Sequence, residues 1–318
     1  MSPIDPDKMA LLKRLFPVLG KHLRKGDCGK IGVIGGSPDY TGAPYFASIT
    51  PMKIGADLAF VYAHSDAAPV IKSYSPELIV YPSTDFATNR HSIERLDALV
   101  FGPGLGRQKH TQNLLADVVN FVRSKQNLCL VIDADGLFFV KECSQLFKGC
   151  TDKVIITPNH REFVRLYTQM FPNQQKGEDT DELKIQCEMA EQLAKHLEVT
   201  VMRKGEIDII SNGSAAQTRI VQAETSMRRC GGQGDILSGA TALFAFWARK
   251  ASDADIYSSE HLLDGAEAAS LLVRNASLRT FQSVGRSMNA ADVIDHIVPV
   301  VRDIDSELSA KAATITTR

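Results

Sequence analysis

The chain has 318 residues, enough for one large α/β domain or two smaller domains with a sizeable core. Its 36 Lys and Arg residues nearly balance its 37 Asp and Glu residues, so the formal net charge is -1. A nearly neutral chain gives no electrostatic reason to expect nucleic acid or an anionic membrane as a partner. The six cysteines are scattered, without a C-x-x-C pair or zinc-ligand spacing, which favours reduced thiols in a cytoplasmic compartment. No apolar stretch is long enough to span a bilayer.

The N-terminal segment, residues 1–24, predicts a helix but no signal peptide. From Met9 to Arg24, Leu, Phe and Val alternate with Lys and Arg, as in some organelle-targeting helices. Asp5 and Asp7 precede this stretch and no apolar h-region is present, which favours an ordinary amphipathic helix packed on the domain. We therefore expect a cytoplasmic protein. Mitochondrial import stays an open alternative that the N-terminus does not support.

The chain then alternates short apolar runs with helical patterns. Buried strands are predicted for residues 30–34, 57–62, 78–81, 98–101, 128–132 and 154–157. Helices are predicted for residues 43–54, 111–123 and 136–142. Strands that are apolar throughout and separated by helices are typical of a parallel sheet covered on both faces.

The pattern changes in the second half of the chain. A charged amphipathic helix is predicted for residues 181–197, followed by a strand, a turn at Lys204-Gly205-Glu206 and a second strand within residues 199–210. Two long apolar helices are predicted for residues 236–249 and 262–278.

No internal repeat, low-complexity tract or linker divides these elements. We therefore predict a single domain over residues 25–303, with a doubly wound α/β fold whose mostly parallel sheet has helices on both faces. The small polar residues at 304–318 predict a disordered tail.

The strongest candidate for a ligand site is the sequence Gly231-Gly232-Gln233-Gly234-Asp235, which leads directly into a long apolar helix. Glycines let the backbone approach a ligand closely, and the first N–H groups of a helix bind phosphate oxygens with help from the helix dipole. Asp235 could be an N-cap or a base that takes a proton from a substrate. A cap gains nothing from a glycine-rich approach, so we favour the base.

Four other loops follow predicted strands at the carboxyl edge of the sheet, where doubly wound folds bind their ligands. They are residues 35–44, 102–107, 133–136 and 157–162, and they are rich in Gly, Asp, Asn and His. Their convergence on one edge predicts a pocket.

Several familiar signatures are absent. The P-loop pattern is not met, because Gly26-Asp27-Cys28-Gly29-Lys30 is too short and continues with Ile31. The dinucleotide G-x-G-x-x-G after the first strand and the hydrolase G-x-S-x-G are also missing. His160 has no neighbouring His or Cys, so no protein metal site is predicted. Any divalent ion is expected to arrive with a nucleotide as Mg²⁺, held mainly by phosphates.

Six motifs stand in one order along the chain. They are Tyr40-Thr41-Gly42-Ala43-Pro44, Phe101-Gly102-Pro103-Gly104-Leu105-Gly106, Ile132-Asp133-Ala134-Asp135-Gly136, Thr157-Pro158-Asn159-His160, Lys204-Gly205-Glu206-Ile207-Asp208 and Cys230-Gly231-Gly232-Gln233-Gly234-Asp235. Together they resemble the ATP-dependent (S)-NAD(P)H-hydrate dehydratase family of eukaryotic type, which has a ribokinase-like fold. The likeness covers about residues 25–300.

The resemblance implies a metabolite-repair enzyme that removes water from the S epimer of hydrated NADH and NADPH, coupled to ATP hydrolysis. Asp235 would be catalytic and would also contact the hydrate. The other residues implied to contact the hydrate are Ala43, Gly104, Gly106, Asn159, His160, Arg161, Glu162, Phe163, Val164 and Arg165. The residues implied to contact ATP are Lys204, Gly205, Glu206, Ile207, Asp208, Thr225, Ser226, Met227, Arg228, Arg229, Cys230, Gly231, Gly232, Gln233 and Gly234.

ATP as co-substrate and Mg²⁺ are the expected cofactors, and small molecules are the expected partners. The sequence leaves open whether the chain forms a homo-oligomer. A small-molecule kinase of the same fold would use the same glycine loop and Asp235 but release a phosphorylated alcohol. The sequence Asn159-His160-Arg161-Glu162-Phe163 matches the dehydratase pattern instead. A non-catalytic nucleotide-binding protein would be expected to have lost Asp235 or the glycine loop, and both are intact.

Overall fold

The computed structural model describes residues 6–21, 23–174 and 182–316. Its strands are β1 (Lys30–Ile34), β2 (Leu58–Tyr62), β3 (Leu78–Tyr81), β4 (Ala98–Phe101), β5 (Cys129–Ile132), β6 (Val154–Ile156), β7 (Thr200–Arg203), β8 (Asp208–Ser211) and β9 (Arg219–Val221). They form one nine-stranded sheet of order β3-β2-β1-β4-β5-β6-β7-β8-β9. Neighbours are parallel from β3 to β7, whereas β8 and β9 are antiparallel additions. The predicted doubly wound, mostly parallel α/β fold is confirmed.

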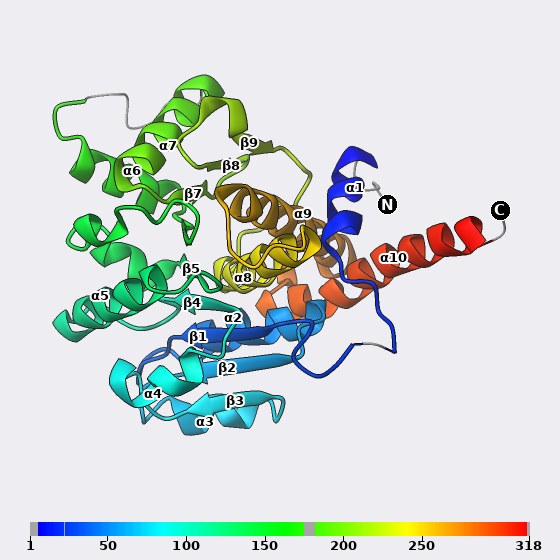
Figure 1. The fold of residues 1–318 in the computed structure, drawn as a ribbon, viewed down its shortest axis with the longest axis horizontal. Helices are drawn as coiled ribbons and strands as arrows, with labels where there is room; N and C mark the ends of the chain where they lie inside the picture. The colour runs from blue at the N-terminus through cyan, green and yellow to red at the C-terminus, as the bar shows by residue number, and fades with distance from the viewer. Residues whose placement is uncertain (1–5, 22, 175–181, 317–318) are drawn as a thin grey trace.

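Helices cover both faces of this sheet (Figure 1). They are α1 (Pro6–Leu15), α2 (Gly42–Ile54), α3 (Ala68–Tyr74), α4 (Phe86–Ile93), α5 (Lys109–Arg123), α6 (His160–Met170), α7 (Leu183–Leu197), α8 (Gln233–Ala251), α9 (Ser259–Val284) and α10 (Ala290–Thr316). Short 3₁₀-helices include η1 (Ala134–Phe139) after β5.

Two hydrophobic cores lie on opposite faces of the sheet because successive strand residues point in opposite directions. In β4, Ala98 and Val100 belong to the core beneath α2, α8 and α9, whereas Leu99 and Phe101 belong to the core beneath α5, α6 and α7. All four side chains are fully buried. This two-sided burial explains why the central strands are apolar throughout.

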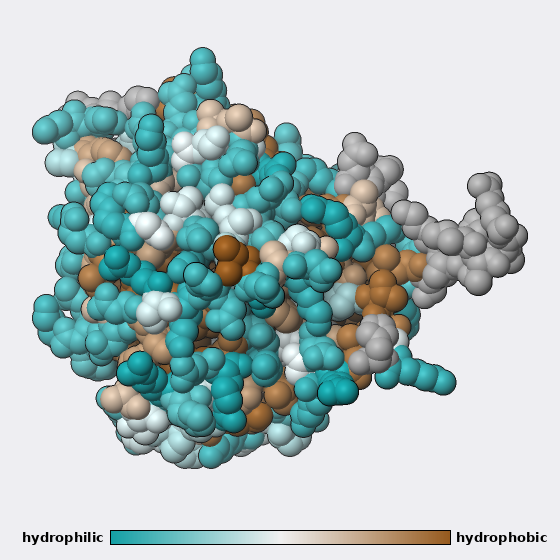
Figure 2. Space-filling view, in the orientation of Figure 1, coloured by the Kyte–Doolittle hydropathy of each residue, from teal (hydrophilic) through white to brown (hydrophobic). Residues whose placement is uncertain are grey.

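The exposed surface matches this arrangement. The face that Figure 2 shows is largely hydrophilic, and its hydrophobic residues appear in separate small patches. No helix in the described part of the chain is long and apolar enough to cross a membrane.

The N-terminal helix is shorter than predicted. It ends at Leu15 and does not continue to Arg24, because Pro17 disfavours helical backbone at the residue before it. Leu12, Leu15 and Phe16 are buried in the core that also contains α8 and α9. The helix therefore packs on the domain, as its amphipathic pattern predicts.

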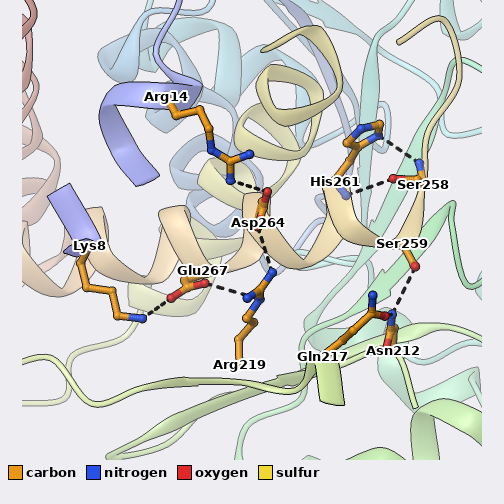
Figure 3. Close-up of polar contacts among 10 residues, drawn as sticks. All are labelled: Lys8, Arg14, Asn212, Gln217, Arg219, Ser258, Ser259, His261, Asp264 and Glu267. Carbon is orange, nitrogen blue, oxygen red and sulfur yellow. Dashed lines mark hydrogen bonds and ion pairs between the residues drawn. The ribbon is translucent and has the colours of Figure 1, made fainter. Parts of the chain in front are cut away.

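Buried charges on α9 fix both α1 and β9 (Figure 3). Asp264 accepts a hydrogen bond from Arg14 of α1 at 2.6 Å and lies 3.4 Å from Arg219 of β9. One turn further along α9, Glu267 pairs with Lys8 of α1 and lies 3.8 Å from Arg219. Three elements that are distant in sequence are thereby joined at one side of α9.

Some local predictions were wrong. The helix predicted for residues 136–142 is the 3₁₀-helix η1, and β9 was not predicted because its three residues carry too short a pattern. Helix α10 covers most of the segment from residue 304 for which we predicted a disordered tail, since Ile304 is buried and Leu308 packs against the core. Asp181, where we predicted the start of α7, lies outside the described residues.

The buried network predicts a clear difference in stability between two ion-pair variants. Asp264→Asn removes a buried charge that serves two arginines, so we expect the free energy of unfolding to fall by about 1–3 kcal/mol. Lys13→Ala, which breaks the exposed pair with Glu307, is the control and should cost less than about 1 kcal/mol. Urea denaturation followed by circular dichroism measures both. Equal losses in the two variants would contradict a special role for the buried pair.

Candidate active site

The loops at the carboxyl edge of the sheet converge at the point where the strand order reverses, between β1 and β4. The Gly36 N–H donates to the Pro103 carbonyl at 2.9 Å, which joins the loop after β1 to the loop after β4. A side chain at Gly102 would lie 1.9 Å from the Asp133 carbonyl oxygen, so the loops after β4 and β5 are also in contact. The predicted convergence of these loops is confirmed.

The glycine loop ends at the N-terminus of α8. Gly232 caps the helix with φ +94°, a left-handed conformation that favours glycine. A Cβ atom there would lie 2.6 Å from Ala290 and 2.8 Å from Phe46, so the loop packs too closely for any side chain. The helix begins at Gln233, and its first N–H groups are therefore available to an anion in front of the loop.

A buried ion pair lies beside this loop. Lys204 Nζ donates to Asp133 Oδ1 at 2.6 Å, and the two side chains are only 16% and 3% exposed. A Cβ atom on Gly234 would lie 3.4 Å from Lys204 Nζ, which places the pair directly against the glycine loop. The Lys204 N–H donates to the Pro158 carbonyl at 2.8 Å, so the end of β7 is fixed to the loop after β6.

Asp235 stands in the first turn of α8 with an unusual ionisation. Burial raises the pKa of its carboxyl from 3.8 to about 8, helped by the negative charge of Asp133, while Lys204 acts in the opposite direction. Burial also disfavours the charged form of Lys204, but the carboxylates of Asp133 and Glu162 outweigh it and raise the Lys204 pKa. A carboxyl group whose pKa lies near neutral pH is suited to accept a proton from a substrate.

The start of α6 brings another carboxylate to the same place. Asn159 accepts a hydrogen bond from the Glu162 N–H at 3.0 Å, and Glu162 accepts one from the Asn159 N–H at 2.8 Å. This capping box fixes the first turn of the helix. Burial raises the pKa of Glu162, which is one of the charges acting on Asp235.

A pocket of about 450 Å³ opens beside the glycine loop. Eleven of its lining residues are among the predicted site residues: Asn159, His160, Lys204, Gly205, Glu206, Asp208, Thr225, Arg229, Cys230, Gln233 and Gly234. Its size suits a small-molecule ligand. The pocket therefore groups most of the residues that the resemblance assigns to ATP.

The remaining predicted ATP residues lie around the pocket without lining it. They are Ile207, Ser226, Met227, Arg228, Gly231 and Gly232. Ser226 is buried and donates to the Arg228 carbonyl at 2.7 Å, whereas the Met227 side chain is 89% exposed. Arg228 donates through Nε to the Met288 carbonyl at 3.2 Å. Ser226 and Arg228 therefore fix the loop that leads into Cys230.

The residues predicted to contact the hydrate form a second group, around the loop after β4. A Cβ atom on Gly104 would lie 3.5 Å from Ala43, and the Gly106 N–H donates to Asp135 at 3.0 Å. Phe163 is an exception, because its side chain is buried in the core below α6. Arg161, Val164 and Arg165 are at least partly exposed on α6.

Sequence reasoning missed the contribution of α9. Val273, Arg274 and Ser277 of this helix line the pocket, together with Leu237 of α8. Arg274 pairs with Asp208 at 2.8 Å and donates to the carbonyls of Gly205 at 2.9 Å and Glu206 at 2.8 Å. It therefore fixes the turn after Lys204. An arginine directly after the apolar run Leu271-Leu272-Val273 was the available signal, because a buried charge needs partners.

Asp133 was also missed as a site residue, although its loop was noted. Its pairing with Lys204 joins positions 71 residues apart, which no local pattern reveals. Among the described residues, no group of three or more His, Cys, Asp or Glu side chains is placed to hold a metal ion.

Comparison with known proteins agrees with this geometry. The family model described as NAD(P)H-hydrate dehydratase matches residues 31–299. The ATP-dependent (S)-NAD(P)H-hydrate dehydratase of Caenorhabditis elegans is 41% identical, with 92% of this chain and 94% of that protein covered. The human protein of the same name is also 41% identical, with 91% and 82% covered.

Solved structures show the same fold. A ribokinase-like superfamily protein from Enterococcus faecalis has a TM-score of 0.73 at 16% identity, covering 93% of this chain and 94% of that one. The ADP/ATP-dependent NAD(P)H-hydrate dehydratase from Bacillus subtilis, co-crystallised with ATP/Mg²⁺, has a TM-score of 0.68 at 17% identity, covering 93% and 97%. The fold is thus ribokinase-like, and the sequence matches show that the chain belongs to the NAD(P)H-hydrate dehydratase family.

Proposed function

We propose that this protein is an ATP-dependent dehydratase that removes water from the S epimer of NADH hydrate and NADPH hydrate and so restores the working coenzymes. The observation that carries the proposal is Asp235, whose carboxyl group has a pKa of about 8 and stands at the helix N-terminus behind the glycine loop. A proton acceptor beside a phosphate-binding loop is what transfer of a phosphoryl group to a hydroxyl requires.

In the first step, Asp235 takes the proton of the hydrate hydroxyl while the hydroxyl oxygen attacks the γ-phosphorus of ATP. A new O–P bond forms while the bond between the γ-phosphorus and its bridging oxygen breaks, and ADP leaves. Backbone N–H groups at the start of α8 and the Lys204 ammonium neutralise negative charge on the transferring group. The step turns hydroxide, a poor leaving group, into a phosphate ester.

In the second step, the lone pair of the ring nitrogen expels inorganic phosphate and the C–O bond breaks. The departing phosphate then takes a proton from the neighbouring carbon, which restores the ring double bond. No further group of the protein is needed as a nucleophile, so the role of the protein here is to hold the ring and exclude water.

We further propose that Mg²⁺ enters with ATP. The donor set of the site fits an ion held mostly by phosphates, because the described residues offer separate carboxylates such as Asp133 and Glu162 and no group of three metal ligands. When bound, Mg²⁺ would neutralise charge on the phosphates. The reduced cysteines support a cytoplasmic location, which we also propose.

The reaction is tested by incubating the protein with ATP and hydrated NADH or NADPH and following the absorbance of the reduced nicotinamide. Asp235→Asn should lower turnover by about 10²–10⁴-fold because the proton acceptor is lost, while ATP still binds. Calorimetry with ATP measures the retained binding. Turnover near that of the original protein in this variant would contradict the role of Asp235, and accumulation of a phosphorylated hydrate would instead support a kinase.

The pH dependence of activity tests the charges around Asp235. Because Asp235 must be deprotonated to act, kcat/KM should rise with pH through about 8 in the free enzyme. Asp133→Asn removes a charge that raises this pKa, so the midpoint should fall by about one unit. Lys204→Met removes a charge that lowers it, so the midpoint should rise by about one unit.

Lys125→Met provides the control for these two variants, because it removes a lysine from a surface pair with Glu94. Its pH profile should coincide with that of the original protein. If the pH midpoint of kcat/KM moved in the same direction in Asp133→Asn and Lys204→Met, the proposed electrostatics would be contradicted.

A further inference from the structure

An exposed aromatic ring lies against two arginines near the loop after β4. Phe138 is on η1, and 40% of its surface is exposed. The guanidinium carbons of Arg107 and Arg165 each lie 5.3 Å from the centroid of its ring. We call these three residues the Arg–Phe–Arg cluster. Two like charges on one exposed ring repel each other. Asp135 offsets part of the charge of Arg107, and an anion between the two guanidinium groups would relieve the repulsion that remains.

Arg107 is held in position by the loop itself. Its Nε donates to Asp135 Oδ1 at 2.9 Å, while the Gly106 N–H donates to Asp135 Oδ2 at 3.0 Å. Because this bond uses Nε, it orients the guanidinium plane without using the terminal amino groups. A planar guanidinium stacked on an aromatic ring is well suited to bind phosphate through two parallel hydrogen bonds.

The cluster extends outward from the catalytic carboxyl group along two helices. In a 3₁₀-helix, residues three apart are eclipsed, so Phe138 lies on the same side of η1 as Asp135. On α6, Arg165 is one turn beyond Glu162 and lies on the same side. Asp135 and Glu162 both act on the charge of Asp235. The cluster is therefore about one helical turn away from the groups that surround Asp235.

The cluster is separate from the pocket of about 450 Å³ beside the glycine loop. None of its three residues is among the described residues that line that pocket. It lies instead beside Gly106, on the side of the site that the resemblance assigns to the hydrate. An anion bound there would consequently belong to the hydrate and not to ATP.

We propose that Arg107, Phe138 and Arg165 bind the diphosphate of the dinucleotide substrate. This inference rests on the proposed function and deepens it. It assigns Arg107 and Phe138 to substrate binding, and it names the diphosphate as the part of the substrate that Arg165 contacts. The diphosphate is joined to the reacting ring through a single ribose, which suits a cluster one helical turn beyond Asp135 and Glu162, the groups that act on Asp235. It is also common to both hydrates, whereas the 2′-phosphate occurs only in NADPH hydrate.

Steady-state kinetics with both hydrates test the assignment. Arg107→Ala and Arg165→Ala should each raise KM for both hydrates by about tenfold or more, while KM for ATP changes less than about twofold. Arg107→Lys keeps the charge but not the planar fork, so its KM should lie between those of Arg107→Ala and the original protein. The control is Arg90→Ala, because the Arg90 guanidinium lies 5.8 Å from the ring centroid of Phe121, near the C-terminal end of α5, and its KM values should not change.

Three results would overturn the proposal. The first is a rise in KM for the hydrates below about twofold, which would make the cluster a surface contact only. The second is an equal rise in KM for ATP. The third is a rise confined to NADPH hydrate, which would assign the cluster to the 2′-phosphate.

A binding measurement separates this proposal from the proposed reaction. Calorimetry compares NADH with dihydronicotinamide mononucleotide, which lacks the diphosphate. The original protein should bind NADH more tightly, and the double variant Arg107→Ala/Arg165→Ala should lose that preference. An unchanged preference in the double variant would overturn the assignment. If the original protein shows the preference but does not restore NADH from its hydrate, the proposed reaction fails while the diphosphate site stands.

Discussion

The buried ion pair between Asp133 and Lys204 is the interaction on which the site depends. It joins the loop after β5 to the end of β7 and lies against Gly234 of the glycine loop. The site has to admit the anionic phosphates of ATP although four carboxyl groups act on one another within it. Lys204 supplies compensating charge, and a pKa of about 8 keeps Asp235 largely neutral near pH 7. The neutral form of Asp235 does not repel the nucleotide, and the fraction that is deprotonated accepts the proton when the hydroxyl reacts, a fraction that grows as the pH rises towards 8.

Helix α9 connects this site to the rest of the domain. Near its start, the buried carboxylates of Asp264 and Glu267 hold α1 and β9 through ion pairs with partly exposed lysine and arginine side chains. Further along, Arg274 binds Asp208 and the carbonyls of the turn after Lys204, and the same helix lines the pocket beside the glycine loop. Its buried charges are costly unless each one is paired, so they fix the position of α9 strongly. The turn after Lys204 is therefore held by a helix whose own position is fixed by its ion pairs with α1 and β9.

The sequence predicted the fold well because parallel strands buried on both faces must be apolar throughout, as β4 and β5 are. It also predicted the glycine loop, since backbone requirements at a helix start leave a local pattern. It missed Asp133 and Arg274 as site residues because their partners are 71 and 66 residues away, and pairings of this kind leave no local signal. The resemblance supplied a set of site residues, but it did not distinguish side chains that face the ligand from those that do not, such as Phe163, which is buried in the core, and Met227, which is 89% exposed.

The most direct test of the mechanism follows the oxygen atom of the hydrate hydroxyl. If Asp235 promotes phosphorylation of that hydroxyl and the ester then loses phosphate, the C–O bond breaks and the oxygen leaves with phosphorus. NADH hydrate labelled with ¹⁸O in the hydroxyl group should therefore transfer its label to inorganic phosphate, as measured by mass spectrometry after one turnover with ATP. Label found in water, with unlabelled phosphate, would show that ATP hydrolysis and dehydration proceed without a phosphorylated hydrate and would contradict the account.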